Sequence, residues 1–243
     1  MLHSTILTPP TFCCGTPIEQ LPRPRMPLSQ RASRRPPVSR SPSAGHAVRI
    51  IGGQWKRTPL VVANLEGLRP TPDRVREALF NWLGHFCGGS LAGLSALDLF
   101  AGSGALGFEA ASRGALRVVL VESQSAAVDA LRAVQAKLKA TQIEILQGDA
   151  LATARRLADS DVRFDLVFLD PPFHRGWIER ALAPAVGALA ASGLLYIEAE
   201  TRIGPEQAHA WGLELLRADK AGQVFYHLLR HRMGPVPGES TSC

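Results

Sequence analysis

The sequence predicts a doubly wound α/β fold with a mostly parallel sheet, a C-terminal antiparallel hairpin and a small N-terminal β-hairpin. From residue 95 onward, short apolar runs alternate with longer segments in which apolar residues recur at helical spacing. The runs are continuous, as in strands that helices cover on both faces, and such alternation produces parallel pairs. The last two runs are joined by only a few residues around Gly222, too few for a parallel crossover, so they must pair antiparallel.

The first 45 residues are predicted to form a disordered basic tail. They are rich in Pro, Ser and Arg without an apolar period, and their six arginines supply most of the formal net charge of +6. The composition also suits an organellar transit peptide, but the prolines between Pro22 and Pro42 would break the amphipathic helix of such a peptide. We therefore favour a bacterial basic arm, with Met26 as a second candidate for the start of translation.

Residues 46–94 are predicted to form a hairpin followed by a helix. Val48–Ile51 and Pro59–Val62 are two short apolar runs on either side of a turn at Gly52-Gly53. Thr71 or Asp73 can cap a helix that ends near Gly84, because apolar residues recur there at helical spacing.

Residues 95–232 are predicted to form the main domain, and residues 233–243 a flexible tail. The predicted strands are Ala96–Phe100, Val118–Val121, Ile143–Leu146, Phe164–Leu169, Leu194–Ile197, Leu213–Leu216 and Val224–Leu229. Helical segments are expected near 103–113, 123–139, 149–159 and 175–191.

Several protein classes are excluded by composition. No apolar run approaches the roughly 18 residues of a membrane span. Cys13, Cys14, Cys87 and Cys243 show no CxxC or Cys/His spacing, which indicates reduced thiols in a cytosolic protein and no metal site.

A glycine-rich loop follows the first strand of the main domain. Gly102, Gly104 and Gly107 fit the GxGxxG pattern, in which the chain turns tightly and a ligand approaches backbone N–H groups at a helix N-terminus. The pattern alone suits NAD(P) as well as S-adenosylmethionine. Glu122, at the end of the second strand, can bind ribose hydroxyls in either case.

Acidic residues narrow the choice of cofactor. Asp98 precedes the glycines, where its carboxylate can oppose a cationic sulfonium, and Asp149 follows the third strand, where it can accept from an adenine amino group. Three acids at three strand ends favour a sulfonium over a phosphate-bearing dinucleotide. The predicted cofactor-binding residues are Asp98, Phe100, Gly102, Gly104, Glu122, Asp149 and Ala150.

The most specific short motif is Asp170-Pro171-Pro172-Phe173, directly after an apolar strand. It resembles the D/N-P-P-Y/F signature of methyltransferases that act on exocyclic amino nitrogens of bases. Such an amino group is a poor nucleophile, and accepting both of its N–H bonds at the Asp170 side chain and the Pro171 carbonyl favours a pyramidal nitrogen. Pro172 stiffens the turn, and Phe173 offers a face on which the base can stack. These four residues are the predicted catalytic set.

Five stretches together resemble one family. Val48–Trp55, Leu68–Leu83, Asp98–Gly107, Asp170–Phe173 and Ala221–Val224 are similar to the bacterial 16S rRNA (guanine(966)-N(2))-methyltransferase family, over roughly residues 48–232. The resemblance implies a class I S-adenosylmethionine-dependent methyltransferase with a Rossmann-like domain. It also implies a cytoplasmic enzyme that methylates guanine N2 in small-subunit rRNA, with the subunit or its late assembly intermediate as substrate. We expect a monomer without an obligate protein partner.

Basic residues near the start of the predicted ordered sequence can bind RNA phosphates, although a solvated charged face explains them equally well. The resemblance places Thr71, Arg74 and Arg76 beside the cleft, where they can touch cofactor, RNA or only each other. Lys220 can approach the target nucleotide or be structural. The candidate RNA-binding residues are Arg49, Lys56, Arg57, Arg69, Thr71, Arg74, Arg76 and Lys220.

Three other functions compete with this interpretation. A DNA adenine-N6 or cytosine-N4 methyltransferase shares the Asp170 turn. A non-catalytic RNA-binding assembly factor would keep the fold, but no expected catalytic position is missing here. A nicotinamide dehydrogenase shares only the glycine loop.

Overall fold

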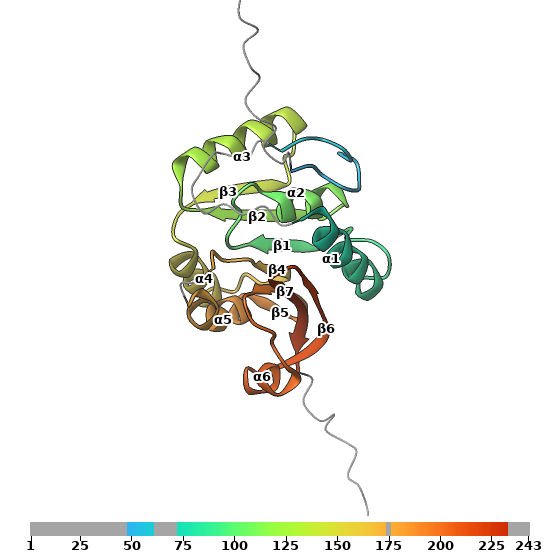
Figure 1. Ribbon diagram of the computed structural model, residues 1–243. Helices are drawn as coiled ribbons and strands as arrows, with labels where there is room; N and C mark the ends of the chain where they lie inside the picture. The colour runs from blue at the N-terminus through green and yellow to red at the C-terminus, as the bar shows by residue number, and fades with distance from the viewer. Residues whose placement is uncertain (1–47, 61–71, 174–175, 233–243) are drawn as a thin grey trace, which may run out of the picture. The chain divides into compact units, whose positions relative to one another are not determined.

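The computed structural model describes residues 48–60, 72–173 and 176–232, all of which belong to one unit of the chain, residues 44–243 (Figure 1). The predicted tails at 1–45 and 233–243 lie outside the described residues, as do Arg69 and Thr71.

Seven strands form one sheet in the order β3-β2-β1-β4-β5-β7-β6. Strands β1 to β5 pair in parallel, whereas β7 is antiparallel to both β5 and β6. The predicted doubly wound fold with a C-terminal antiparallel hairpin is therefore confirmed. The strands are β1 (Ser95–Asp98), β2 (Arg117–Glu122), β3 (Ile143–Gln147), β4 (Phe164–Leu169), β5 (Leu189–Ala199), β6 (Leu213–Ala221) and β7 (Val224–His231).

Helices cover both faces of the sheet and create two apolar cores. One core holds residues of α1, α2 and α3, such as Leu79, Phe108 and Leu131, and the other holds residues of α4, α5 and α6, such as Ala154, Ala185 and Ala208. Neighbouring strand residues face opposite cores, which explains why the central strands are apolar throughout. The helices are α1 (Asp73–Phe86), α2 (Ala105–Ser112), α3 (Ser125–Leu138), α4 (Ala150–Ala158), α5 (Trp177–Gly187) and α6 (Pro205–Ala210).

Strand β5 begins earlier than the sequence predicts. The segment Leu189–Gly193 was expected to extend a helix to residue 191, but the helix ends at Gly187 and Leu189 pairs with Phe164 of β4. A register shift follows between Phe164 and Leu166. Pairing with a buried neighbour outweighs the helical preference of Ala190 and Ala191 here.

The predicted N-terminal hairpin lies only partly within the described residues, because Val61 and Val62 fall outside them. Within residues 48–60 the antiparallel pairing amounts to an isolated bridge between Arg49 and Pro59, flanked by a hydrogen bond from the Leu60 N–H to the Val48 carbonyl. Proline has no N–H to donate. Further along the loop, Ile50 and Arg57 still donate across the hairpin, whereas Ile51, Gly52 and Trp55 donate to side chains of α2. We call residues 48–60 the N-terminal loop.

Residues at the C-terminal end of α2 hold the N-terminal loop in place. Glu109 is fully buried and accepts the N–H groups of Ile51 (2.6 Å) and Gly52 (2.8 Å) and the guanidinium of Arg113 (2.7 Å). Gly53 has a φ of 75°, and a Cβ there would lie 1.9 Å from the Ser112 carbonyl oxygen. Gly53 is therefore required for close approach as well as for the turn.

Candidate active site

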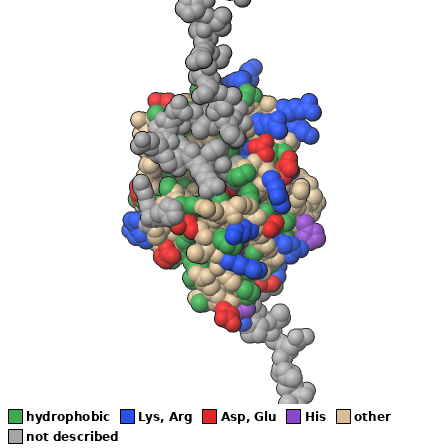
Figure 2. Space-filling view, viewed as in Figure 1, with side chains coloured by type: hydrophobic (Ala, Val, Ile, Leu, Met, Phe, Trp, Pro, Cys, Tyr) green, Lys and Arg blue, Asp and Glu red, His purple; other side chains and the backbone are tan. Residues whose placement is uncertain are grey.

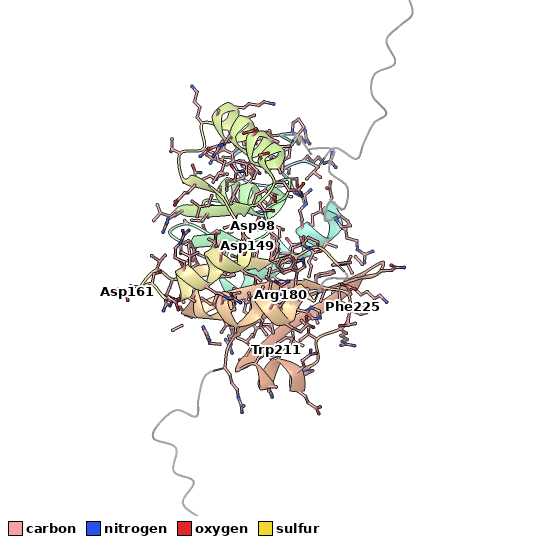
Figure 3. All side chains as sticks on the ribbon, turned by 90° about the vertical axis from the view of Figure 1, so that its left-hand side faces the viewer. Asp98, Asp149, Asp161, Arg180, Trp211 and Phe225 are labelled. Atoms are coloured by element: carbon pink, nitrogen blue, oxygen red, sulfur yellow. The ribbon has the colours of Figure 1, made fainter. Side chains whose placement is uncertain are left out.

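Acidic side chains line the edge at which the parallel strands end. Asp98, the last residue of β1, lies beside Phe168 of β4, and Asp170 follows β4 two residues later. Because Leu169 pairs with Ile197, Asp170 lies level with Glu198 of β5. The arrowheads of β1 to β3 point toward this edge in Figure 1, and Figure 3, which faces it, labels Asp98 and Asp149 near the centre. The sheet thus gathers carboxylates from separate strands.

Asp98 is a buried acid with incomplete hydrogen bonding. Its side chain is 1% exposed, and one carboxylate oxygen accepts the Gly107 N–H at 3.2 Å. The other oxygen, Oδ1, has no hydrogen-bond partner of ordinary geometry among the described residues. Burial, followed by the negative charge of Asp170, raises the pKa of Asp98 to about 7. A cationic ligand placed against Oδ1 would relieve both effects.

The glycine-rich loop lies directly above Asp98. Gly104 precedes α2 with a φ of 76°, and a Cβ there would lie 2.6 Å from side-chain atoms of both Leu131 and Phe108. A Cβ on Gly107 would lie 2.1 Å from Leu120 of β2. These glycines therefore hold α2 tightly against the sheet, which leaves the loop backbone open toward the strand ends.

Glu122 and Asp149 already accept hydrogen bonds from nearby backbone N–H groups. Glu122 accepts the N–H groups of Gly102 (2.9 Å) and Gln124 (2.8 Å). Asp149 is the N-cap of α4 and accepts the N–H of Ala152 at 2.8 Å, and Ala150 after it is buried. A carboxylate can accept about four hydrogen bonds, so both keep the capacity to accept from a ligand.

Phe100 and the Asp170 turn lie close to the start of α5. Phe100 makes an edge-on ring contact with Trp177, with centroids 5.4 Å apart. Pro171 is buried, Pro172 is exposed and Phe173 is half-buried. The three turn residues line a pocket of ≈ 270 Å³ together with residues of β5, α5 and α6. Three of the four predicted catalytic residues therefore face a cavity slightly smaller than most ligand pockets, and Asp170 directly precedes them.

Two residues of β5 belong to this edge although the sequence reasoning missed them. Glu198 is 3% exposed and lines the same pocket, and its Oε1 accepts the Tyr196 hydroxyl at 2.8 Å. Burial, followed by the charge of Glu198, raises the pKa of Tyr196 well above its usual range, so the hydroxyl remains a donor. An acid inside the apolar run Leu194–Ala199 was the available signal.

Arg74 and Lys220 are brought together near the β6–β7 turn. The Lys220 ammonium lies 4.6 Å from the centroid of the Phe225 ring, and the backbone N–H of Lys220 donates to the Asp219 side chain. This N–H, the Tyr226 hydroxyl and the charge of Arg74 lower the pKa of Asp219. Because Tyr226 pairs with Glu198, these exposed cations lie at the same edge as the carboxylates.

Arg76 is a correction to the predicted RNA-binding set. Its side chain is fully buried and donates to the Arg49 carbonyl (2.7 Å) and to Asp73 (2.6 Å). A buried guanidinium cannot reach a phosphate, so Arg76 ties α1 to the N-terminal loop. Arg49, by contrast, is exposed and pairs with Asp73 at 3.2 Å.

Lys56 and Arg57 are exposed on the N-terminal loop. Figure 2 shows Lys and Arg side chains at the upper right of the molecule, over the loop that Figure 1 colours blue. Arg74 lies on α1 and Lys220 on β6, so the candidate RNA-binding residues come from separate elements.

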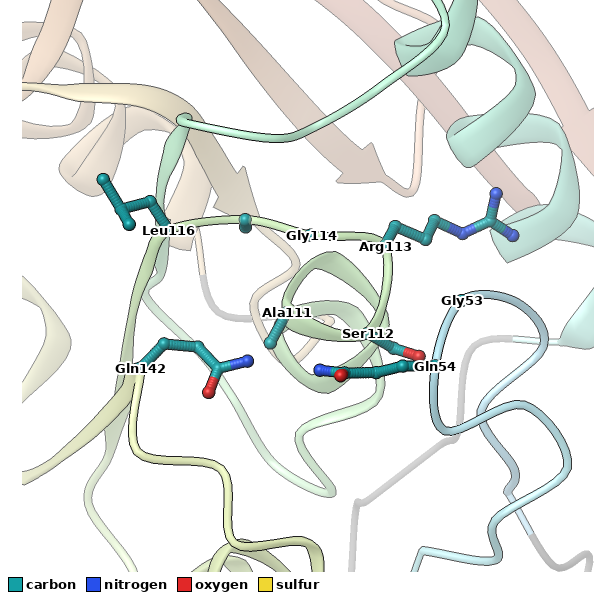
Figure 4. Close-up of a pocket in the computed structure, with 9 residues that line it drawn as sticks. Gly53, Gln54, Ala111, Ser112, Arg113, Gly114, Leu116 and Gln142 are labelled. Atoms are coloured by element: carbon teal, nitrogen blue, oxygen red, sulfur yellow. The ribbon is translucent and has the colours of Figure 1, made fainter.

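A second pocket lies at the opposite edge of the sheet. It has a volume of ≈ 500 Å³, and Gln54, Arg113 and Gln142 are among its lining residues (Figure 4). Gln142 directly precedes β3 and Leu116 directly precedes β2, so this pocket opens where the strands begin. None of the predicted catalytic or cofactor-binding residues lines it.

Metal clusters and membrane-spanning helices are both absent from the described residues. In those ranges no group of three or more His, Cys, Asp or Glu side chains could hold a metal ion. No helix there is both long and apolar enough to cross a membrane.

Known proteins resemble this chain in sequence and in structure. The family model described as conserved hypothetical protein 95 matches residues 48–230. The ribosomal RNA small subunit methyltransferase D of Escherichia coli K12 is 42% identical over 201 residues, which cover 82% of this chain and 96% of that protein. The Haemophilus influenzae protein of the same name is 39% identical over 198 residues, covering 79% and 97%.

A solved structure is similar as well. A putative methyltransferase from Escherichia coli superposes with a TM-score of 0.64 at 37% identity, and covers 76% of this chain and 98% of its own. The fold is therefore that of the class I methyltransferases, as the resemblance implied.

Proposed function

Because this chain belongs to the family described as conserved hypothetical protein 95, whose curated relatives carry the name ribosomal RNA small subunit methyltransferase D, we propose a specific reaction for it. The protein transfers a methyl group from S-adenosylmethionine to the exocyclic N2 of a guanine in 16S rRNA. The observation that carries this proposal is the Asp170-Pro171-Pro172-Phe173 turn placed beside a buried, incompletely bonded Asp98.

The residues present fit a sulfonium cofactor. Asp98 Oδ1 is buried without a hydrogen-bond partner among the described residues, and burial and the charge of Asp170 raise the pKa of Asp98 to about 7. A cation bound against this oxygen would favour the ionised carboxylate and would itself be stabilised. Gly104 has a positive φ, and a Cβ there would clash with Leu131 and Phe108, so only glycine fits in this loop at the N-terminus of α2, where the backbone can approach a ligand. Glu122 and Asp149 would hold the ribose hydroxyls and the adenine amino group. When bound, S-adenosylmethionine supplies a methyl group on a positively charged sulfur.

The turn residues act on the acceptor. The Asp170 carboxylate and the Pro171 carbonyl each accept one N–H of the amino group, which directs the nitrogen lone pair away from the ring. Pro171 and Pro172 have fixed φ angles and no N–H of their own, so the carbonyl is held rigidly. The nitrogen becomes acidic only once it carries the methyl, so no separate strong base is required.

Phe173 supports capture of the base. Its half-buried ring lines the ≈ 270 Å³ pocket, where a guanine that has left the RNA stack can pack against it. Stacking of this kind contributes about 1–3 kcal/mol per base.

The rest of the chain serves substrate selection in this proposal. Residues 46–94 form an RNA-contacting extension of a methyltransferase domain at 95–232, with Lys56 and Arg57 toward phosphates on one side and Arg74 and Lys220 near the target nucleotide on the other. The substrate is the small ribosomal subunit or its late assembly intermediate. We propose a cytoplasmic monomer.

Methyl transfer from labelled S-adenosylmethionine to small subunits that lack the modification tests the proposal, with nucleoside analysis as readout and Asp170→Ala as the inactive control. The expected product is N2-methylguanosine. Label in adenosine or cytidine would overturn the assignment to guanine, and transfer only to duplex DNA would support a DNA adenine-N6 or cytosine-N4 methyltransferase. Binding of subunits without any transfer would indicate a non-catalytic assembly factor.

A further inference from the structure

We propose that Glu198 selects guanine by accepting the N1–H of the target base, an inference that rests on the proposed function. The Asp170 turn alone does not distinguish guanine from adenine or cytosine, because all three carry an exocyclic amino group with two N–H bonds. A residue that reads the neighbouring ring nitrogen is therefore needed for specificity.

Glu198 is in the right place for this role. It lies level with Asp170 on the adjacent strand, because Leu169 pairs with Ile197, and it lines the ≈ 270 Å³ pocket together with the three residues that follow Asp170. Tyr226 pairs with it on the other side, in β7. A base whose amino group meets Asp170 therefore presents its next ring position toward β5.

Tyr196 holds the Glu198 carboxylate. The Tyr196 hydroxyl donates to Oε1 at 2.8 Å from a side chain that is 1% exposed, so the carboxylate is fixed in a buried site. A carboxylate can accept several hydrogen bonds at once, so the bond from Tyr196 is compatible with a second bond from a base. Tyr196 is thus a positioning residue, and Glu198 contacts the substrate.

The hydrogen-bonding edge of guanine fits this arrangement. Guanine carries a donor at N1 beside its amino group, whereas adenine N1 and cytosine N3 are acceptors next to theirs. A carboxylate is an acceptor only, so it bonds guanine and repels the lone pair of the other two bases. Glu198 then supplies the discrimination that the turn lacks.

Replacement of the target guanine by 2-aminopurine tests the inference on the unaltered enzyme. This base keeps the amino group at C2 but has an acceptor at N1. With reconstituted small subunits that carry either base at the target position, we expect kcat/KM for 2-aminopurine to be at least about 100-fold lower. Equal kcat/KM values for the two bases would overturn the role of Glu198 while leaving the proposed function intact.

Glu198→Gln provides the reciprocal test. The amide can donate to N1 of 2-aminopurine, so the preference for guanine should fall by at least about 100-fold, partly through a gain on 2-aminopurine. Glu206→Gln, an exposed acid of α6, is the matched control and should keep the wild-type preference. A parallel loss on both bases by Glu198→Gln would indicate a structural role and overturn the inference. Absence of N2-methylguanosine with the wild-type enzyme would overturn the proposed function itself.

Discussion

Two buried acids of this molecule, Glu109 and Asp98, have opposite surroundings. Glu109 is 0% exposed and its two oxygens accept two backbone N–H groups and the Arg113 guanidinium. Asp98 is 1% exposed, has one oxygen without a partner among the described residues, and lies near Asp170, with its pKa raised to about 7.

The difference separates a structural acid from a binding acid. A buried carboxylate that is paired and fully hydrogen-bonded holds segments together, as Glu109 holds the N-terminal loop on α2. A buried carboxylate that lacks a hydrogen-bond partner destabilises the free protein, and such groups gather at functional sites. Changes at the strand ends should therefore affect chemistry more than folding, and changes at Glu109 the reverse.

The largest effect is expected at Asp170. Asp170→Ala should lower kcat for methyl transfer by at least about 1000-fold, because the acceptor amine loses the side chain that shapes its nitrogen. The Kd for S-adenosylmethionine, measured by calorimetry, should stay within a few fold. A parallel loss of cofactor binding would contradict the division between cofactor and acceptor residues.

Glu109→Gln should lower the free energy of unfolding by about 3 kcal/mol, because it breaks a buried pair and leaves Arg113 without its anion. Denaturant titration measures this, and residual kcat below the unfolding transition should be near normal. Glu144→Gln is the matched control: its pair with Arg117 is about half exposed on both sides, so the change should be under about 1 kcal/mol. Equal destabilisation by the two variants would remove the distinction drawn for Glu109.

Asp98→Asn should stabilise the free protein at about pH 8, by up to about 4 kcal/mol. The pKa of Asp98 is raised from 3.8 to about 7 in the folded state, so the folded protein binds more protons than the unfolded chain between these values. Its stability therefore falls as pH rises through this window, and the advantage of Asn should disappear toward about pH 4. Unfolding curves over this range check the sign, and an Asn variant less stable at every pH would contradict it.

The smallest of these effects is expected at Phe173. Phe173→Ala should weaken base capture by about 1–2 kcal/mol, seen chiefly as a higher KM for small subunits. Phe173→Tyr keeps the ring and should restore near-normal KM. Unchanged KM in the Ala variant would exclude stacking from the proposed mechanism.

The sequence predicted those features that depend on local pattern. Continuous apolar runs identified the buried strands, and the glycine loop and the Asp170 turn were placed at strand ends, where the structure also has them. The structure brings Asp98 and Asp170 close together, as expected of residues that follow neighbouring parallel strands.

Features that depend on distant partners were missed. The buried state of Arg76 depends on the Arg49 carbonyl, 27 residues away, and the role of Glu109 depends on Ile51, 58 residues away. Tyr196 and Glu198 lay within an apolar run whose period carries no information about ligands. The early start of β5 likewise follows from pairing with Phe164 rather than from its own sequence.

The most direct test asks whether a sulfonium binds against the unpartnered oxygen of Asp98. The measurement is the affinity of the free enzyme for S-adenosylmethionine and for S-adenosylhomocysteine, from about pH 6 to about pH 8. The first ligand carries a positive charge and the second does not. We predict that the preference for S-adenosylmethionine rises as Asp98 ionises around pH 7, and that Asp98→Asn abolishes this rise. An identical pH dependence for both ligands in the wild-type enzyme would contradict the account.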